Sequence, residues 1–136
     1  MILFIDDEAR LMDSHRQHLE FQLGDHQKQL RYFSDVDSAM AYFSENSSEV
    51  ELVVLDVMMP PGHSFQESNH GLKTGFFVYR KFRESRPELP ILFYTNANDE
   101  VLAEKPREDK NLKYLSKVNY PLLDDLWGEV KKELKL

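Results

Sequence analysis

Acidic side chains stand directly after two apolar runs of this 136-residue chain. In "ILFIDDE" Asp6 and Asp7 follow four apolar residues, and in "VVLDVMMPPG" Asp56 ends a second run. Thr95 follows "ILFY", and Lys117 follows "LKYLS". Gathered carboxylates suit a hard cation such as Mg²⁺, and a carboxylate can also be the nucleophile that forms an aspartyl phosphate. A hydroxyl and an ammonium suit phosphoryl oxygens. Whether these groups act together depends on the fold that positions them.

Five short apolar runs recur with helical patterns between them, at Ile2–Ile5, Leu30–Phe33, Leu52–Leu55, Ile91–Tyr94 and Leu112–Leu115. Strands that alternate with helices indicate an α/β protein with a parallel sheet. The first, third and fourth runs are apolar throughout, as in strands covered on both faces, whereas the second and fifth carry a basic residue, as edge strands can. Right-handed crossovers then favour the order 2-1-3-4-5, a doubly wound (βα)5 flavodoxin-like sandwich.

Helices are predicted between these runs. The expected ranges are about 9–23, 34–43, 72–84, 98–105 and 122–134. Ser34 and Asp37 form a capping pattern for the second helix, and Pro106 is expected to end the fourth early. In the last helix a spacing of four predicts the buried face Leu122, Leu126, Val130 and Leu134.

A long polar loop is predicted after the third strand, at about 60–71. Its sequence "PGHSFQESNHG" has two glycines, two histidines and no apolar period. Loops of this length are usually either functional or mobile. His63 and His70 flank Glu67 there, so a metal site is conceivable, although solvated loop residues explain the same pattern. His15 and His18 are interpreted as residues of the first helix, with His15 on the stripe of Leu11 and Leu19.

The predicted fold brings the reactive side chains to one edge of the sheet. Ligands of doubly wound proteins bind outside the carboxyl ends of the strands, where the strand order reverses. That point lies between the first and third strands, so Asp6, Asp7, Asp56, Thr95 and Lys117 are expected to converge there. Packed carboxylates raise one another's pKa unless a cation neutralises them. The pattern argues against flavin phosphate, which needs glycines, hydroxyls and a helix N-terminus after the first strand.

The chain resembles the receiver domain of bacterial two-component response regulators. Four motifs carry the resemblance, each at a predicted strand end and in this order: "FIDDE", "VVLDVMMP", "ILFYTNA" and "YLSK". The resemblance covers essentially the whole chain and implies a single receiver domain over residues 1–136. It implies a signalling switch that accepts a phosphoryl group from a histidine kinase or histidine phosphotransfer protein. Such a domain catalyses its own phosphorylation and slow dephosphorylation without being a conventional enzyme.

The resemblance also implies roles for the acidic residues. Asp56 matches the phosphoacceptor. Asp7 matches the direct Mg²⁺ ligand, and Asp6 acts on the metal directly or through water. Asp56 and the backbone carbonyl of Met58 would complete the metal site.

The remaining motif residues match the switch. Thr95 corresponds to the hydroxyl that moves to the phosphoryl group, Tyr114 to the aromatic that then turns inward, and Lys117 to the lysine that contacts a phosphoryl oxygen. The face made by helix 4, strand 5 and helix 5 would then change its affinity for a downstream protein. Two departures are Asn96, where the family usually has a small residue, and Val118, where the lysine is usually followed by proline. The loop after strand 3 is longer than usual, and no output domain follows, as in a stand-alone receiver.

Composition limits the setting. The net charge of −7 argues against direct nucleic-acid binding, and no apolar run is long enough to span a bilayer. The start "MILFIDDEAR" has no basic segment or cleavage site of a signal peptide. The absence of cysteine fits a reducing compartment. These features are compatible with a bacterial cytoplasm, which the resemblance implies, and formation of a homodimer is left open.

Two other functions are considered. Asn96, Val118 and the long loop favour a receiver-like binding module that works without phosphorylation. A haloacid-dehalogenase-like hydrolase would need a general acid two residues after its aspartate, where this chain has Met58. Each residue also has a plain structural interpretation: strand-end acids can cap the next turn or helix, Lys117 can be a surface lysine, and Thr95 and Tyr114 can be ordinary strand residues.

Overall fold

The protein forms one parallel five-stranded sheet in the computed structural model, which describes residues 1–65, 73–98 and 100–136. The strands are β1 (Ile2–Ile5), β2 (Leu30–Phe33), β3 (Leu52–Leu55), β4 (Ile91–Thr95) and β5 (Leu112–Ser116). Their order is β2-β1-β3-β4-β5 and every neighbouring pair is parallel, which confirms the predicted topology. The last two strands each run one residue further than predicted.

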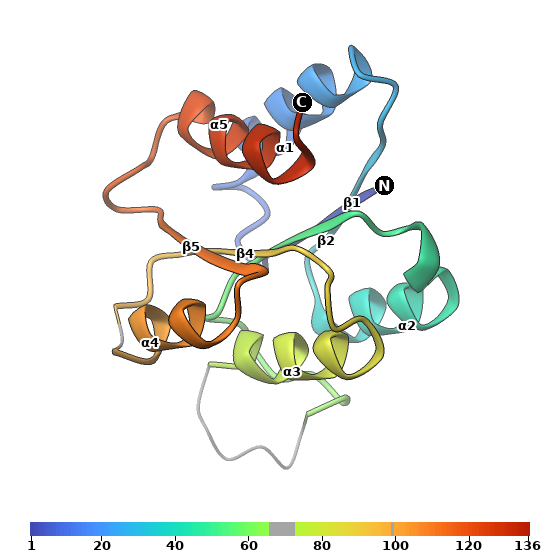
Figure 1. Cartoon of the computed structure of the whole chain (residues 1–136), viewed down its shortest axis with the longest axis vertical. Coiled ribbons are helices and arrows are strands. Elements are labelled where there is room, and N and C mark those ends of the chain that lie inside the picture. Colours follow the sequence, from blue (N-terminus) through green and yellow to red (C-terminus); the bar gives the residue numbers. More distant parts are fainter. Residues whose placement is uncertain (66–72, 99) are drawn as a thin grey trace.

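The described residues also form five α-helices and one short 3₁₀ helix, which lie between successive strands except for the last helix, which follows the fifth strand. They are α1 (Asp13–Gly24), α2 (Val36–Asn46), η1 (Ser47–Glu49), α3 (Gly75–Ser85), α4 (Glu100–Glu108) and α5 (Leu123–Leu134). Figure 1 shows α1 and α5 on one face of the sheet and α2, α3 and α4 on the other. The fold is therefore the doubly wound sandwich expected from the sequence. Among the described residues, no helix combines the length and apolar character needed to cross a membrane.

The strands divide their side chains between two buried clusters. Successive residues of a strand point to opposite faces of the sheet. Leu3 and Ile5 of β1 therefore belong to the cluster with α2, α3 and α4, whereas Ile2 and Phe4 belong to the cluster with α1 and α5. All four residues are fully buried. Covering both faces explains why β1, β3 and β4 are apolar without alternation.

The first two helices begin differently from the prediction. Helix α1 starts at Asp13 rather than near residue 9, because residues 9–12 form turns instead, with Met12 N donating to Glu8 O at 3.0 Å. Helix α2 is capped by Asp35, which accepts a hydrogen bond from Ser38 N at 2.7 Å. The predicted cap at Ser34 is therefore wrong by one residue.

Two further helix predictions are corrected. Pro106 does not end α4, which continues to Glu108, because a proline in the last turns removes only one backbone hydrogen bond. Leu122 is 66% exposed and does not belong to the buried face of α5. It stands at the N-cap, before the first helical turn, so the spacing of four does not bring it inward. Leu126 and Val130 are fully buried as predicted.

Gly75 allows α3 to begin against the end of β3. Its N–H donates to Val57 O at 2.9 Å. A Cβ atom at this position would lie 2.3 Å from the carbonyl oxygen of Asp56 and 2.5 Å from Val57 Cα. Any other residue would push α3 away from the backbone that carries the Asp56 carboxylate.

Gly75→Ala is therefore expected to lower the free energy of unfolding by about 1–3 kcal/mol, because backbone atoms cannot move aside cheaply. Gly128→Ala is the matched control, since nothing lies within 4 Å of the added Cβ. That change is expected to raise stability by up to about 1 kcal/mol, since alanine favours the helix. Urea unfolding followed by circular dichroism measures both. Equal effects of the two substitutions would contradict this account of Gly75.

Candidate functional site

The carboxyl edge of the sheet brings together the side chains that the sequence singled out. Asp6 follows β1, Asp56 follows β3, Thr95 ends β4 and Lys117 follows β5. These four residues are buried, with Asp6 and Thr95 fully so. Asp7 lies beside them, and one carboxylate oxygen each of Asp6, Asp7 and Asp56 can be chosen so that all lie within 4.8 Å of one another.

Lys117 is the cation of this cluster. Its Nζ lies 2.7 Å from Asp6 Oδ2, 3.4 Å from Asp56 Oδ2 and 3.8 Å from Glu8 Oε2. Only 6% of its side chain is exposed, so the alternative of an ordinary surface lysine is excluded. Removing one partner of a buried ion pair leaves the other charge uncompensated, which is strongly destabilising. Lys117 therefore binds together acids from two separate strand ends.

The cluster has more acidic groups than basic ones, and the pKa values of its members reflect this. Burial raises the pKa of Asp6 to about 6, and the nearby Asp56 carboxylate adds to this, although Lys117 opposes it. Burial and Asp56 also raise the pKa of Asp7. Burial alone would lower the pKa of Lys117, but Asp6 and Asp56 outweigh it, so that pKa is raised. One ammonium does not neutralise the neighbouring acids.

The donor set fits a hard divalent cation. Asp7 Oδ1 is buried and has no hydrogen-bond partner among the described residues. It faces two carboxylates of like charge, and close oxygen ligands of this type suit Mg²⁺. Asp6 Oδ1 is held by Glu8 N at 2.9 Å, and Asp56 Oδ1 by Met58 N at 3.3 Å. Backbone amides thus orient one oxygen of each carboxylate.

These hydrogen bonds from backbone N–H groups also test the alternative that the acids merely cap the turn or helix that follows each strand. Asp56 does cap the turn that follows β3, through Met58 N, and this is compatible with a chemical role. Asp6 caps a turn at Glu8, but it does not cap α1, which begins at Asp13. Sequence reasoning gave no role to Glu8, whose carboxylate also faces Lys117. Its position directly after Asp6 and Asp7 in the "DDE" motif could have indicated that Glu8 lies near the site.

Thr95 and Tyr114 both bind the backbone of Ala97. Thr95 Oγ1 accepts from Ala97 N at 3.2 Å, and Tyr114 OH donates to Ala97 O at 3.2 Å. Thr95 is fully buried, whereas Tyr114 is 36% exposed and lies on the surface of β5. One peptide segment after β4 therefore joins a hydroxyl at the site to an aromatic ring at the surface.

The chain after Lys117 turns without proline at the next position. Val118 N and Asn119 N both donate to Ser116 Oγ at 3.2 Å. The structure contains no cis peptide bond among the described residues. The Ser116 hydroxyl therefore holds the turn at the position where the family usually has a proline.

The described start of the segment between β3 and α3 is bound to α2. Asp37 of α2 accepts from His63 N at 2.9 Å and from Ser64 N at 2.8 Å. These backbone donors and the Ser64 hydroxyl lower the pKa of Asp37 to about 2. Glu67 and His70, which with His63 suggested a metal site, lie outside the described residues.

A doubly wound sheet with acids after β1 and β3, a threonine ending β4 and a lysine after β5 defines the receiver class of signalling domain. The family model of the response regulator receiver domain matches residues 2–121. The chain therefore belongs to this family, as its four motifs indicated. Membership supports a phosphorylation-regulated role in two-component signal transduction.

Solved structures show the same fold. A CheY-like receiver domain protein of Methanospirillum hungatei has a TM-score of 0.73 at 19% identity, covering 98% of this chain and 92% of that one. The receiver domain of NtrX from Brucella abortus has a TM-score of 0.70 at 21% identity, with coverage of 99% and 98%. The chemotaxis protein CheY4 of Vibrio cholerae gives 0.68 at 20% identity, with coverage of 98% and 97%. The search of curated proteins finds no match.

Stability is expected to fall as pH rises through about 6 in Mg²⁺-free buffer. The folded-state pKa of Asp6 is raised, so its contribution is complete below the unfolded pKa of 3.8 and is lost above the folded one. The loss is on the order of a few kcal/mol. Urea unfolding from about pH 4 to 7.5 measures it, with Asp6→Asn as the control that removes the titrating group. The difference between the two proteins isolates Asp6 from the histidines. Parallel pH profiles would refute the assignment.

Proposed function

We propose that Asp56 accepts a phosphoryl group and that the chain is a phosphorylation-activated signalling switch of a two-component phosphorelay. The donor is the phosphohistidine of a histidine kinase or of a histidine phosphotransfer protein. One observation carries the proposal: the buried Asp56 carboxylate lies 3.4 Å from a buried ammonium and beside two further acids, at the edge where doubly wound sheets bind ligands. This combination is costly to bury and has no evident value for folding alone.

The reaction follows from these groups. A carboxylate oxygen of Asp56 forms a P–O bond while the P–N bond of the donor breaks, and the electron pair of that bond returns to the imidazole ring. Lys117 is within reach of the product, because its Nζ is already 3.4 Å from Asp56 Oδ2. An ammonium there stabilises the phosphoryl oxygens as the group arrives. Backbone N–H of Met58 keeps the other Asp56 oxygen oriented.

Asp6, Asp7, Asp56 and the Met58 carbonyl are the proposed ligands of Mg²⁺. When bound, the ion supplies positive charge that neutralises the acids and the oxygens of the entering phosphoryl group. Two observations support this assignment: the raised pKa of Asp6, and the Asp7 oxygen that has no hydrogen-bond partner in the described part of the chain.

Thr95 and Tyr114 would carry the signal away from Asp56. A phosphoryl group adds strong acceptors, and the Thr95 hydroxyl, which now accepts from Ala97 N, would move toward it to donate and draw on that contact. The same residue holds the Tyr114 hydroxyl through its carbonyl. A shift of Ala97 therefore releases Tyr114 from the surface of β5, which is a local change that biases a two-state element.

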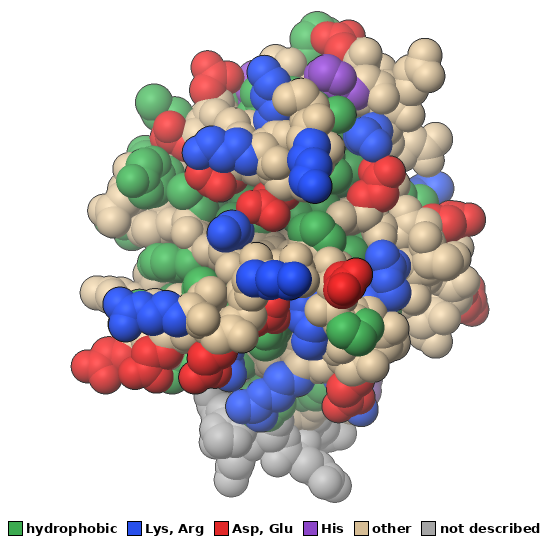
Figure 2. All heavy atoms as spheres, viewed as in Figure 1, with side chains coloured by type: hydrophobic (Ala, Val, Ile, Leu, Met, Phe, Trp, Pro, Cys, Tyr) green, Lys and Arg blue, Asp and Glu red, His purple; other side chains and the backbone are tan. Residues whose placement is uncertain are grey.

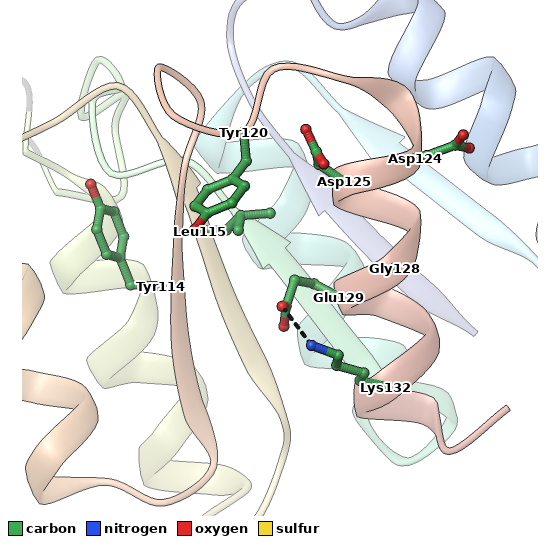
Figure 3. A pocket seen from close by; sticks show the side chains of 8 residues that line it. All are labelled: Tyr114, Leu115, Tyr120, Asp124, Asp125, Gly128, Glu129 and Lys132. Atoms are coloured by element: carbon green, nitrogen blue, oxygen red, sulfur yellow. Dashed lines mark hydrogen bonds and ion pairs between the residues drawn. The ribbon is translucent and has the colours of Figure 1, made fainter.

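The surface that responds is formed by α4, β5 and α5. An open groove of about 460 Å³ lies between β5 and α5, with Tyr114 and Tyr120 on one side and Asp124, Gly128 and Lys132 on the other (Figure 3). Apolar side chains also gather at the left margin of the face in Figure 2, where Figure 1 has the loop between β5 and α5. Val118, Tyr120 and Leu122 of this loop are 70%, 49% and 66% exposed. A downstream protein docks here in our proposal.

Intact mass spectrometry after incubation with Mg²⁺ and acetyl phosphate tests the proposal. Wild type is expected to gain one phosphoryl group, and to gain none when Mg²⁺ is first chelated. Asp56→Asn is expected to gain none, since it lacks the nucleophile. Asp25→Asn, an exposed acid after α1, is the matched control and should behave as wild type.

Two outcomes would contradict the proposal. An adduct on Asp56→Asn would assign the acceptor to another residue. Failure of wild type to gain mass, with bound Mg²⁺ verified and hydrolysis monitored by released phosphate, would favour the binding module that works without phosphorylation. Multiple turnover of small phosphate esters would instead revive the hydrolase.

A further inference from the structure

The loop that follows Lys117 has little apolar packing of its own. Residues 118–122 are all exposed, and they connect β5 to α5. Burial of side chains therefore does not fix the path of this loop. Hydrogen bonds to the backbone of the loop must do so instead.

Within the loop, every backbone N–H finds an acceptor. Lys117 N donates to Thr95 O at 3.0 Å, and Tyr120 N donates to Ser116 O at 2.9 Å. Ser116 Oγ accepts from the two residues between them. Leu122 N donates to Asp125 Oδ2 at 3.0 Å. These bonds close the turn, but they join only neighbouring parts of the chain, apart from the one to β4.

Two side chains from other elements of the fold bind backbone carbonyls of the loop. Tyr94 OH donates to Tyr120 O at 3.0 Å. His15 Nε2 lies 3.0 Å from Pro121 O and 3.3 Å from the Tyr94 hydroxyl oxygen. A carbonyl oxygen can only accept, so His15 Nε2 carries the proton and donates. Two successive carbonyls are thus fixed by residues of α1 and β4.

Tyr94 also lies under the ammonium of Lys117. Its ring centroid is 5.9 Å from Lys117 Nζ, a distance at which the ring face attracts a cation. Tyr94 is 1% exposed, and burial raises the pKa of its hydroxyl to about 12, so it remains a donor at neutral pH. Tyr94 therefore places its ring beside the Lys117 ammonium and its hydroxyl on the loop that follows Lys117.

We infer that His15 and Tyr94 are positioning residues for Lys117. By fixing the carbonyls of Tyr120 and Pro121, they set the exit path of the chain after Lys117 and so keep its ammonium between Asp6 and Asp56. The expected effect on phosphorylation rests on the proposed function, in which a displaced Lys117 slows phosphoryl transfer to Asp56. The placement of the ammonium itself does not depend on phosphorylation.

Nuclear magnetic resonance of the lysine ammonium groups tests the placement directly. In ¹⁵N-lysine-labelled protein, the Lys117 signal is assigned by its loss in Lys117→Arg. Tyr94→Phe, which removes only the hydroxyl, and His15→Leu are expected to shift or broaden this signal. His15→Gln offers an amide donor and is expected to restore it in part. Tyr79→Phe is the matched control, because it deletes another largely buried tyrosine hydroxyl, bonded to Asp109, on the opposite face of the sheet.

The rate of acetyl phosphate-dependent phosphorylation is the second readout. Tyr94→Phe and His15→Leu are expected to slow it by about threefold or more, with the Mg²⁺ Kd changed less than about twofold, because a small misplacement of a catalytic group is costly. Tyr79→Phe should leave the rate unchanged even where it lowers the Tm. A general loss of stability would slow Tyr79→Phe as well, so it cannot explain slow phosphorylation that is confined to the Tyr94 and His15 variants.

The inference is overturned if Tyr94→Phe and His15→Leu keep the Lys117 signal at its wild-type position. It is overturned equally if Tyr79→Phe shifts that signal as much as they do. If His15→Leu does not fold, Tyr94→Phe and His15→Gln decide by the same signal. If wild type accepts no phosphoryl group, the proposed function fails, and the Lys117 signal still decides whether His15 and Tyr94 position it.

Discussion

The burial of the Asp6 and Asp56 carboxylates around one ammonium is the constraint on which the rest of this structure depends. Asp6, Asp7, Glu8 and Asp56 lie near Lys117, so negative charge exceeds positive charge at the carboxyl edge of the sheet. Buried charges must be paired or neutralised. Three strand ends must therefore be held in register. The backbone amides that orient Asp6 and Asp56, and the close approach of α3 at Gly75, serve this requirement.

The same constraint explains how a local event can reach the surface. Any group that enters beside Asp56 changes the balance of charge and acceptors there, and in the proposed switch the Thr95 hydroxyl, which accepts from Ala97 N, moves to donate to it. In that proposal Ala97 would carry the change to Tyr114, because its N–H and its carbonyl bind the two hydroxyls. On the opposite face of the sheet, His15 and Tyr94 hold the chain after Lys117. The site is thus connected to the surface on both sides.

The sequence predicted the sheet well and the helix ends less well. Apolar runs define β1, β3 and β4 because both faces are covered, and residues that follow the strands must meet at one edge. The start of α1 and the cap of α2 depend on local turns that compete closely, so they differ by a few residues from the prediction. Contacts distant in the sequence were beyond reach. Tyr94 was predicted as a strand residue and His15 as a helix residue, but nothing local shows that both bind the loop after Lys117.

Proton release on Mg²⁺ binding tests the central claim most directly, because it reports the shared charge of the buried acids. Calorimetry in two buffers of different ionisation enthalpy measures it. The pKa of Asp6 is raised to about 6. The account therefore predicts that Mg²⁺ binding displaces a substantial fraction of a proton near pH 6 and almost none near pH 8. Binding without proton release near pH 6, or no binding at either pH, would contradict it.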